Sequence, residues 1–217
     1  MSVVVAIKEN GKVYLGADSQ TSRGESKRTT MCKNNFKIWQ VRGSKNCMMG
    51  LVGNKRDANI VKLMSNLVTD YDEFKGDIDF EYVVKSVVPD IRRELRKYEF
   101  LSEDDFKYFD SSFIFAYKDQ LYYIGCDGAV IEIDDFIAIG SGNCEAMGSL
   151  SSTEGLAPEE RIIKAIKSSS DFTIHVDYPI VISNTGDCEF DIVTRENECE
   201  YIQMIYSQEE EGVDDEI

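Results

Sequence analysis

The sequence predicts a fold that mixes β-strands with α-helices, in the order strands, two helices, strands, two helices, strands. Short β-branched or aromatic runs bounded by Gly, Asn and Asp indicate the strands, and apolar residues at three- and four-residue spacing indicate the helices. The chain has 217 residues, 42% of them hydrophobic and 11% aromatic, which is enough to bury a substantial core. Because no internal repeat or linker divides it, residues 1–207 are expected to form a single domain.

The chain begins with a predicted β-hairpin. Residues 3–7 are β-branched and apolar, residues 12–17 form a second strand-like run, and Asn10-Gly11 between them is typical of a tight turn with positive φ. The hairpin would return Asp18 to the beginning of the first strand. If Met1 is removed, Ser2 carries both a hydroxyl nucleophile and an α-amine with a pKa of about 8, which can act as its base.

The later strands are predicted from apolar, β-branched or aromatic runs between turn residues. They cover residues 36–41, 47–52, 111–117, 121–126, 130–133, 136–139, 174–182, 190–195 and 201–206. Residues 21–32 are polar and are expected to form a loop. The acidic residues 208–217 are expected to form a solvated, disordered tail.

Four helices are predicted. The first begins near Asp57, and the other three cover residues 80–98, 143–150 and 158–167. Pro89 should kink or divide the second of these. Pro158, followed by two acidic residues, favours the beginning of the last.

Charge and composition exclude several classes of function. A net charge of −16 disfavours nucleic acid or an anionic membrane surface as a partner, because both would repel the chain. There is no apolar run of roughly eighteen residues and no secretion-signal pattern. The six cysteines form no Cys-x-x-Cys pair and are expected to be free thiols in a reducing cytoplasm.

No cofactor is expected either. Metal-ligand spacing and a glycine-rich phosphate loop are both absent from the sequence. His175 is the only histidine, so a Ser-His-Asp system would require that one ring to face the site.

Several short segments resemble, in order, the proteasome β-type family of N-terminal nucleophile hydrolases, in particular the bacterial proteasome-like peptidases. The segments are Ser2-Val-Val-Val-Ala-Ile, Asn10-Gly11, Gly16-Ala-Asp-Ser-Gln-Thr21, Phe36-Lys37-Ile38, Gly50-Leu-Val-Gly53-Asn-Lys-Arg-Asp57-Ala58, Ile137-Ala-Ile-Gly-Ser-Gly142 and Ser170-Asp171. Their order and spacing together make the resemblance specific. It implies an α+β fold, a four-layer αββα sandwich of two antiparallel sheets flanked by helices.

By this resemblance, Ser2 is the nucleophile, where family members normally have threonine; serine has the same hydroxyl and lacks only the methyl group. Lys37 would lie near that hydroxyl and favour its deprotonation, and Asp18 would pair with Lys37. Burial would lower the lysine pKa and the carboxylate would raise it, and the sequence leaves open which effect dominates. The ordinary alternatives are a strand lysine pointing to solvent and a turn-capping carboxylate.

The resemblance also implies the other parts of the site. Gly53 would donate its backbone N–H to the oxyanion formed when Ser2 attacks a peptide carbonyl; the alternative is a plain turn residue. Ser141 and Asp171 would hydrogen-bond near the terminal amine, or else cap a helix or turn. The residues expected to line the substrate pocket are Thr21, Asn35, Val52 and Lys55.

Two positions depart from the family pattern. Asn54 stands where family members commonly have a second glycine, and Ile174 stands where many β-type subunits have a serine three residues after the aspartate. Asn tolerates left-handed backbone, so Asn54 affects only the detail of its loop. Ile174 removes one polar partner from the amine.

The implied function is a cytoplasmic peptidase that acts on peptides or unfolded proteins within a homo-oligomeric ring, with an ATP-dependent unfoldase as a candidate partner. An inward-pointing Lys55 would favour an acidic residue before the cleaved bond. Two alternatives stay open: a catalytically silent proteasome-like subunit that retains Met1, and a small-molecule amidase of the wider superfamily.

Overall fold

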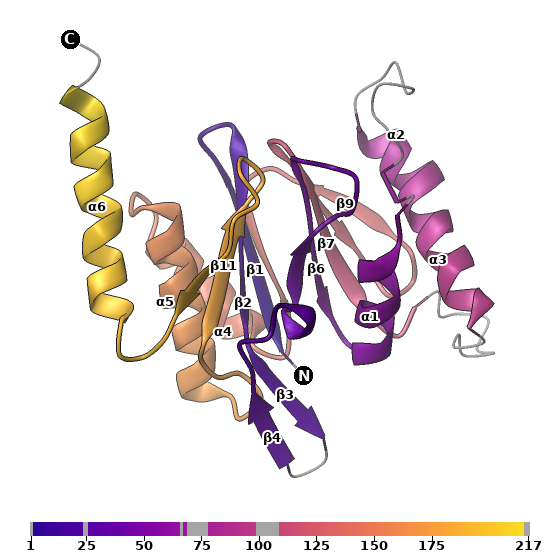
Figure 1. The fold of residues 1–217 in the computed structure, drawn as a ribbon, viewed down its shortest axis with the longest axis horizontal. Helices are drawn as coiled ribbons and strands as arrows, with labels where there is room; N and C mark the ends of the chain where they lie inside the picture. Colours follow the sequence, from indigo (N-terminus) through magenta and orange to yellow (C-terminus); the bar gives the residue numbers. More distant parts are fainter. Residues whose placement is uncertain (1, 24–25, 66, 69–77, 99–108, 215–217) are drawn as a thin grey trace.

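The computed structural model describes residues 2–23, 26–65, 67–68, 78–98 and 109–214, and arranges them in four layers (Figure 1). One five-stranded antiparallel sheet has the order β10-β1-β2-β11-β12. Its strands are β1 (Val3–Glu9), β2 (Lys12–Asp18), β10 (Phe136–Gly140), β11 (Ile180–Asn184) and β12 (Asp191–Val193). Helices α4 (Asn143–Ser152) and α5 (Pro158–Phe172) cover its outer face.

The second five-stranded antiparallel sheet has the order β5-β6-β7-β8-β9. Its strands are β5 (Ile38–Gln40), β6 (Cys47–Val52), β7 (Ser112–Tyr117), β8 (Gln120–Ile124) and β9 (Val130–Ile133). Its outer face is covered by α1 (Lys55–Leu63), α2 (Phe80–Tyr82), the π-helical turn η2 (Val83–Val87) and α3 (Val88–Lys97). The two sheets pack on each other between the helix layers, which confirms the predicted αββα sandwich.

Strand β1 shows why the first residues of the chain are so apolar. Val3 and Val5 face α4 and α5, whereas Val4 and Ala6 face the opposite sheet. Since alternate side chains point to opposite faces and both faces are covered, every position from Val3 to Ala6 is fully buried. The predicted turn is confirmed, with φ of 53° at Asn10 and 73° at Gly11.

The helices over the second sheet differ from the prediction in their boundaries. Residues 80–97 are helical throughout, as predicted, but the π-helical turn η2 lies between α2 and α3, and Pro89 lies in the first turn of α3. The absent N–H of proline costs nothing there, so Pro89 fits the beginning of the helix. Helix α1 ends at Leu63, although the apolar stripe continues to Leu67 and Val68, which are buried outside the helix.

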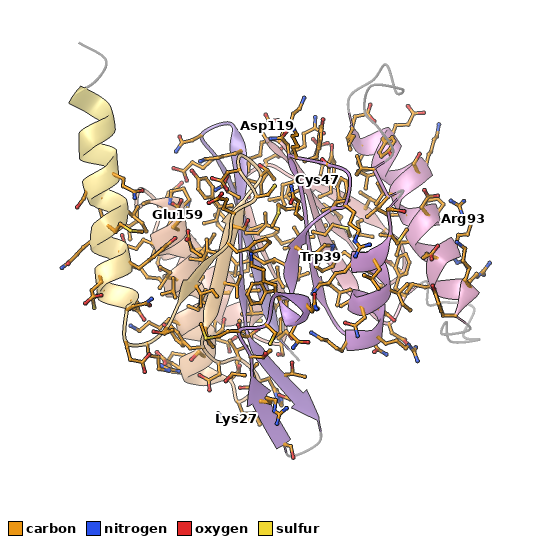
Figure 2. All side chains as sticks on the ribbon, viewed as in Figure 1. Lys27, Trp39, Cys47, Arg93, Asp119 and Glu159 are labelled. Atoms are coloured by element: carbon orange, nitrogen blue, oxygen red, sulfur yellow. The ribbon has the colours of Figure 1, made fainter. Side chains whose placement is uncertain are left out.

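The predicted loop over residues 21–32 is wrong. Strands β3 (Gln20–Arg23) and β4 (Ser26–Thr29) form a hairpin that projects from the sandwich in Figure 1 and carries Lys27, labelled in Figure 2. Strand β4 is exposed at every position, so no buried face imposes an apolar alternation on its sequence. The segment that follows the hairpin contains a short 3₁₀ turn, η1 (Lys33–Asn35).

The C-terminal predictions are wrong as well. Residues 201–206 lie in α6 (Glu198–Asp214) rather than in a strand, and residues 208–214, expected to be disordered, continue that helix. Tyr201, Ile202 and Ile205 recur at helical spacing and pack against the rest of the fold. The strand predicted from residue 174 begins only at Ile180, after Pro179, which has no N–H for the sheet.

Two further findings concern the chain as a whole. All six cysteines are free, and Cys47 and Cys188 are buried. Among the described residues, no helix has the length and apolar character needed to cross a bilayer.

Candidate active site

Ser2 lies directly before β1 and is 7% exposed. Its backbone is fixed from the end of β10. The Ser141 N–H donates to the Ser2 carbonyl at 2.8 Å, and the Ser2 N–H donates to Ser141 Oγ at 3.1 Å. Gly140 has φ of +104°, and a Cβ there would lie 2.1 Å from the Ser2 carbonyl oxygen. The glycine therefore permits the close approach that joins Ser141 to Ser2.

Asp18, at the end of β2, forms a buried ion pair with Lys37. Lys37 Nζ lies 2.6 Å from Asp18 Oδ1, and the two side chains are 11% and 0% exposed. The carboxylate also accepts the N–H of Val3 at 2.9 Å and that of Gln20 at 3.1 Å. Asp18 therefore connects Lys37 to the residue directly after Ser2.

Burial has the largest effect on the pKa values of Lys37 and Asp18. It lowers the pKa of Lys37 below its ordinary value, against the opposing attraction and hydrogen bond of Asp18. It likewise raises the pKa of the Asp18 carboxyl, although Lys37 and two backbone N–H groups oppose the change. The Lys37 ammonium is thus easier to deprotonate than that of an exposed lysine.

Gly53 occupies the turn between β6 and α1. Its φ is +128°, and a Cβ at this position would lie 2.6 Å from the Asp110 carbonyl and 2.7 Å from Ser111. A side chain is therefore excluded by sterics as well as by backbone conformation. Within the described part of the chain, the Gly53 N–H donates to no protein acceptor.

A cavity of about 230 Å³ brings Ser2, Lys37 and Gly53 together. Two of the predicted pocket residues, Thr21 and Lys55, line it as well. The complete lining is Ser2, Gln20, Thr21, Ser22, Phe36, Lys37, Leu51, Gly53, Asn54, Lys55 and Ala58. A serine, a buried lysine and a glycine whose N–H has no protein acceptor among the described residues thus line the same space.

The other two predicted pocket residues lie beside this cavity. Val52 lines a neighbouring hollow of about 340 Å³, to which Ser2, Gly53 and Ser141 also contribute. Asn35 lies behind Lys55, and its carbonyl accepts a hydrogen bond from Lys55 Nζ at 2.9 Å.

Asp171 is not brought to Ser2. Its side chain is exposed in the last turn of α5 and lines a separate hollow of about 550 Å³, together with His175. Among the described residues, the hydrogen bonds of Ser2 reach Ser141 and none reaches Asp171. The buried polar residue at this end of α5 is Ser169, whose hydroxyl donates to the Gly142 carbonyl at 2.7 Å and so supports the segment after Ser141.

Sequence reasoning missed other residues around the site. Ser111 donates to Asp57 at 2.9 Å and accepts the Asn54 N–H, so it touches the turn that contains Gly53. The sequence marks Asp57 as the beginning of a helix, and no local pattern connects it with Ser111, 54 positions later. Lys62 is a further example, because burial lowers its pKa to about 8 while it donates to the carbonyls of Asn34 and Phe36.

Comparisons with known proteins agree with this architecture. The sequence profile of the family described as "Proteasome subunit" matches residues 2–169. The ATP-dependent protease subunit HslV of Petrotoga mobilis is 28% identical over 181 residues, which cover 80% of this chain and 91% of the relative.

Solved structures share the fold at low sequence identity. Thiobacillus denitrificans BPH superposes with a TM-score of 0.68 at 18% identity, over 86% of this chain and 98% of that chain. The ancestral β-subunit Anbu from Yersinia bercovieri gives 0.67 at 15% identity, over 97% and 94%. The fold is that of the proteasome-like N-terminal nucleophile hydrolases. Because the family profile covers well over half of the 217 residues, the chain belongs to the proteasome subunit family.

Proposed function

We propose that this chain is a peptidase whose nucleophile is the hydroxyl of Ser2, exposed as the N-terminal residue when Met1 is removed. The observation that carries the proposal is the shared cavity, which is lined by Ser2, by Lys37 and by Gly53, whose N–H donates to no protein acceptor among the described residues. An alcohol, a group that favours its deprotonation and a donor for the developing oxyanion are what acyl transfer requires.

In the proposed reaction, Ser2 Oγ attacks the carbonyl carbon of a peptide bond, and its proton passes to the α-amine. The carbonyl oxygen becomes an oxyanion that accepts the Gly53 N–H. As the tetrahedral intermediate collapses, the C–N bond breaks and the leaving amine takes the proton. The resulting ester on Ser2 is then hydrolysed by water, with the α-amine as the base.

The surroundings of Ser2 support these roles. Its nitrogen, the future α-amine, is held at 3.1 Å from Ser141 Oγ. Lys37 is fixed by Asp18, is buried and lines the same cavity as Ser2, so its positive charge acts in a medium that screens it weakly. That charge favours the alkoxide of Ser2 and the neutral form of the amine. Asp171 would join this group only through a rearrangement of the end of α5, so its role beside the amine stays a prediction.

For specificity, we propose that the cavity prefers an acidic side chain before the cleaved bond. Lys37 and Lys55 contribute positive charge to its lining, and among the described residues no carboxylate lines it. Lys37 is paired with Asp18, whereas Lys55 donates to a neutral carbonyl of Asn35. The uncompensated charge of Lys55 would attract Asp or Glu. A peptide library should show this preference in the wild type and lose it in Lys55→Gln; equal cleavage after neutral residues would exclude it.

We also propose that the chain acts in a homo-oligomeric ring and receives substrate from an ATP-dependent unfoldase. This part rests on the relatives, one of which is named an ATP-dependent protease subunit. Free thiols at all six cysteines are compatible with the cytoplasm as its location. The mass of the assembly in solution, by light scattering, tests the ring, since a monomeric particle would contradict it.

Two measurements test the proposed reaction. Intact mass should show loss of Met1, and hydrolysis of fluorogenic peptides should disappear in Ser2→Ala and persist in Ser2→Thr, which keeps the hydroxyl. A purified chain that retains Met1 and is inactive would favour the catalytically silent subunit. Hydrolysis confined to small amides, with peptides untouched, would favour the amidase.

A further inference from the structure

We propose that Asp57 and Ser111 are positioning residues that hold the Gly53 turn in place for the oxyanion. This inference rests on the proposed function, because it assigns to these residues the support of the same reaction. Neither residue lines the cavity that Ser2 shares with Lys37, and Ser111 lines the neighbouring hollow. They would act through the turn between them.

The hydrogen bonds form a chain from helix to turn. Ser111 Oγ donates to Asp57 Oδ2 at 2.9 Å, which directs the lone pairs of the hydroxyl towards the Asn54 N–H, and that N–H donates to Ser111 Oγ at 2.9 Å. A serine hydroxyl can donate once and accept at the same time, so the two bonds fix its orientation. The Asn54 N–H belongs to the peptide unit that directly follows Gly53, so this bond fixes the C-terminal side of Gly53, one peptide unit from the Gly53 N–H.

Burial makes this arrangement sensitive to substitution. Asp57 and Ser111 are each 2% exposed. A polar group buried to this degree destabilises the fold unless it is hydrogen-bonded, and its hydrogen bonds are stronger than those of an exposed group. An exposed serine or aspartate near the turn would hold it far less strictly.

Close packing links the same residues to Gly53 directly. The space that a Cβ on Gly53 would occupy is limited by Asp110 O, Ser111 Cα and Ser111 Oγ, all within 2.7 Å. The residues directly before β7 thus pack against the turn, while the Gly53 N–H is left without a protein acceptor among the described residues. A closely packed turn with an uncommitted N–H is what a preorganised oxyanion site needs.

Steady-state kinetics with a peptide substrate can test the inference. Ser111→Ala and Asp57→Leu should lower kcat by about 10- to 100-fold, because a small displacement of the oxyanion donor weakens transition-state binding, while KM stays within about twofold. Asp57→Asn keeps an oxygen acceptor for Ser111 and should retain most of the activity. Val61→Ala is the matched control, because it removes buried volume from α1 without touching the network.

A second readout separates positioning from general damage. The Ser2 hydroxyl adds to the carbon of a peptide aldehyde, and the former carbonyl oxygen then lies at the oxyanion position. In Ser111→Ala, affinity for the aldehyde should fall about 10-fold or more, while affinity for the same peptide ending in a carboxamide should be unchanged.

Each other outcome overturns the inference. Wild-type kcat in Ser111→Ala, equal losses for aldehyde and carboxamide, or an equal loss in Val61→Ala would each show that the pair does not position the donor. In these cases the proposed function stands, because wild type remains active and Ser2→Ala inactive. Absence of Ser2-dependent hydrolysis in the wild type overturns both proposals together.

Discussion

Replacing Lys37 by methionine should destabilise the fold strongly, because it leaves Asp18 buried without its cation. The Asp18 side chain is 0% exposed and lies 2.6 Å from the lysine Nζ. In Lys37→Met the Asp18 carboxylate still accepts hydrogen bonds from the N–H groups of Val3 and Gln20. It loses Lys37, the charged group among its hydrogen-bond donors in the described residues. Methionine fills a similar volume, so the change is mainly one of charge.

The expected magnitude follows from that burial. Removing one partner of a buried ion pair costs about 3–5 kcal/mol, because the remaining charge is uncompensated. For a chain of this size, 1 kcal/mol corresponds to roughly 2–4 °C in the unfolding midpoint, so Tm should fall by about 6–20 °C at neutral pH. Lys27→Met is the matched control, since Lys27 is 65% exposed in its pair with Asp177 and should contribute about 0–1 kcal/mol.

The cost should depend on pH with a definite sign. Burial raises the pKa of Asp18 even beside Lys37, and loss of the cation raises it further. A carboxyl with a raised pKa in the folded state binds its proton more readily there than in the unfolded chain. The penalty is therefore small near pH 4, where the group is protonated, and grows as the pH rises through the folded-state pKa.

Urea unfolding at several pH values between about 4.5 and 7.5, at one protein concentration, measures this directly. The double variant Asp18→Asn/Lys37→Met removes both charges and should recover more than half of the lost stability at pH 7.5. Our account of the site is refuted if Lys37→Met is no less stable than Lys27→Met, or if the double variant is no more stable than the single one.

Three further changes have defined outcomes. Gly53→Ala would place a Cβ 2.6 Å from a backbone carbonyl and should lower kcat about 100-fold in peptide hydrolysis; normal turnover would exclude Gly53 as a donor. Gly16→Ala would place a Cβ 2.1 Å from Ile162 Cγ2 and should cost about 1–3 kcal/mol in urea unfolding, whereas Gly148→Ala, where nothing lies within 4 Å, should be neutral or slightly stabilising. Burial lowers the pKa of Lys62 to about 8, so between that pH and about 10.5 the unfolded chain binds more protons than the folded one. The free energy of unfolding, relative to that of Lys62→Met, should therefore rise by about 1 kcal/mol over this pH range after solvent screening. A difference between the two proteins that does not change with pH would contradict the lowered pKa.

Much of the fold could be predicted from local patterns. The hairpin of β1 and β2, the strand β6 and the beginning of α5 follow from apolar runs, Asn10-Gly11 and Pro158, whose effects act within a few residues. The β3–β4 hairpin and α6 could not be predicted equally well. Exposed strands carry no apolar alternation, and the apolar residues of α6 were compatible with a short strand until packing selected the helical face.

The sequence by itself determined which residues to examine: Ser2, Asp18, Lys37, Gly53 and Ser141, through the order of their motifs. Only the tertiary structure decided that these five meet, that Asp171 lies apart, and that Ser111 supports the turn. It also decided the direction of the Lys37 pKa, because desolvation and pairing depend on how many atoms of distant segments surround the ammonium. Dielectric environment and long-range hydrogen bonding are properties of packing, and no local stretch of residues contains them.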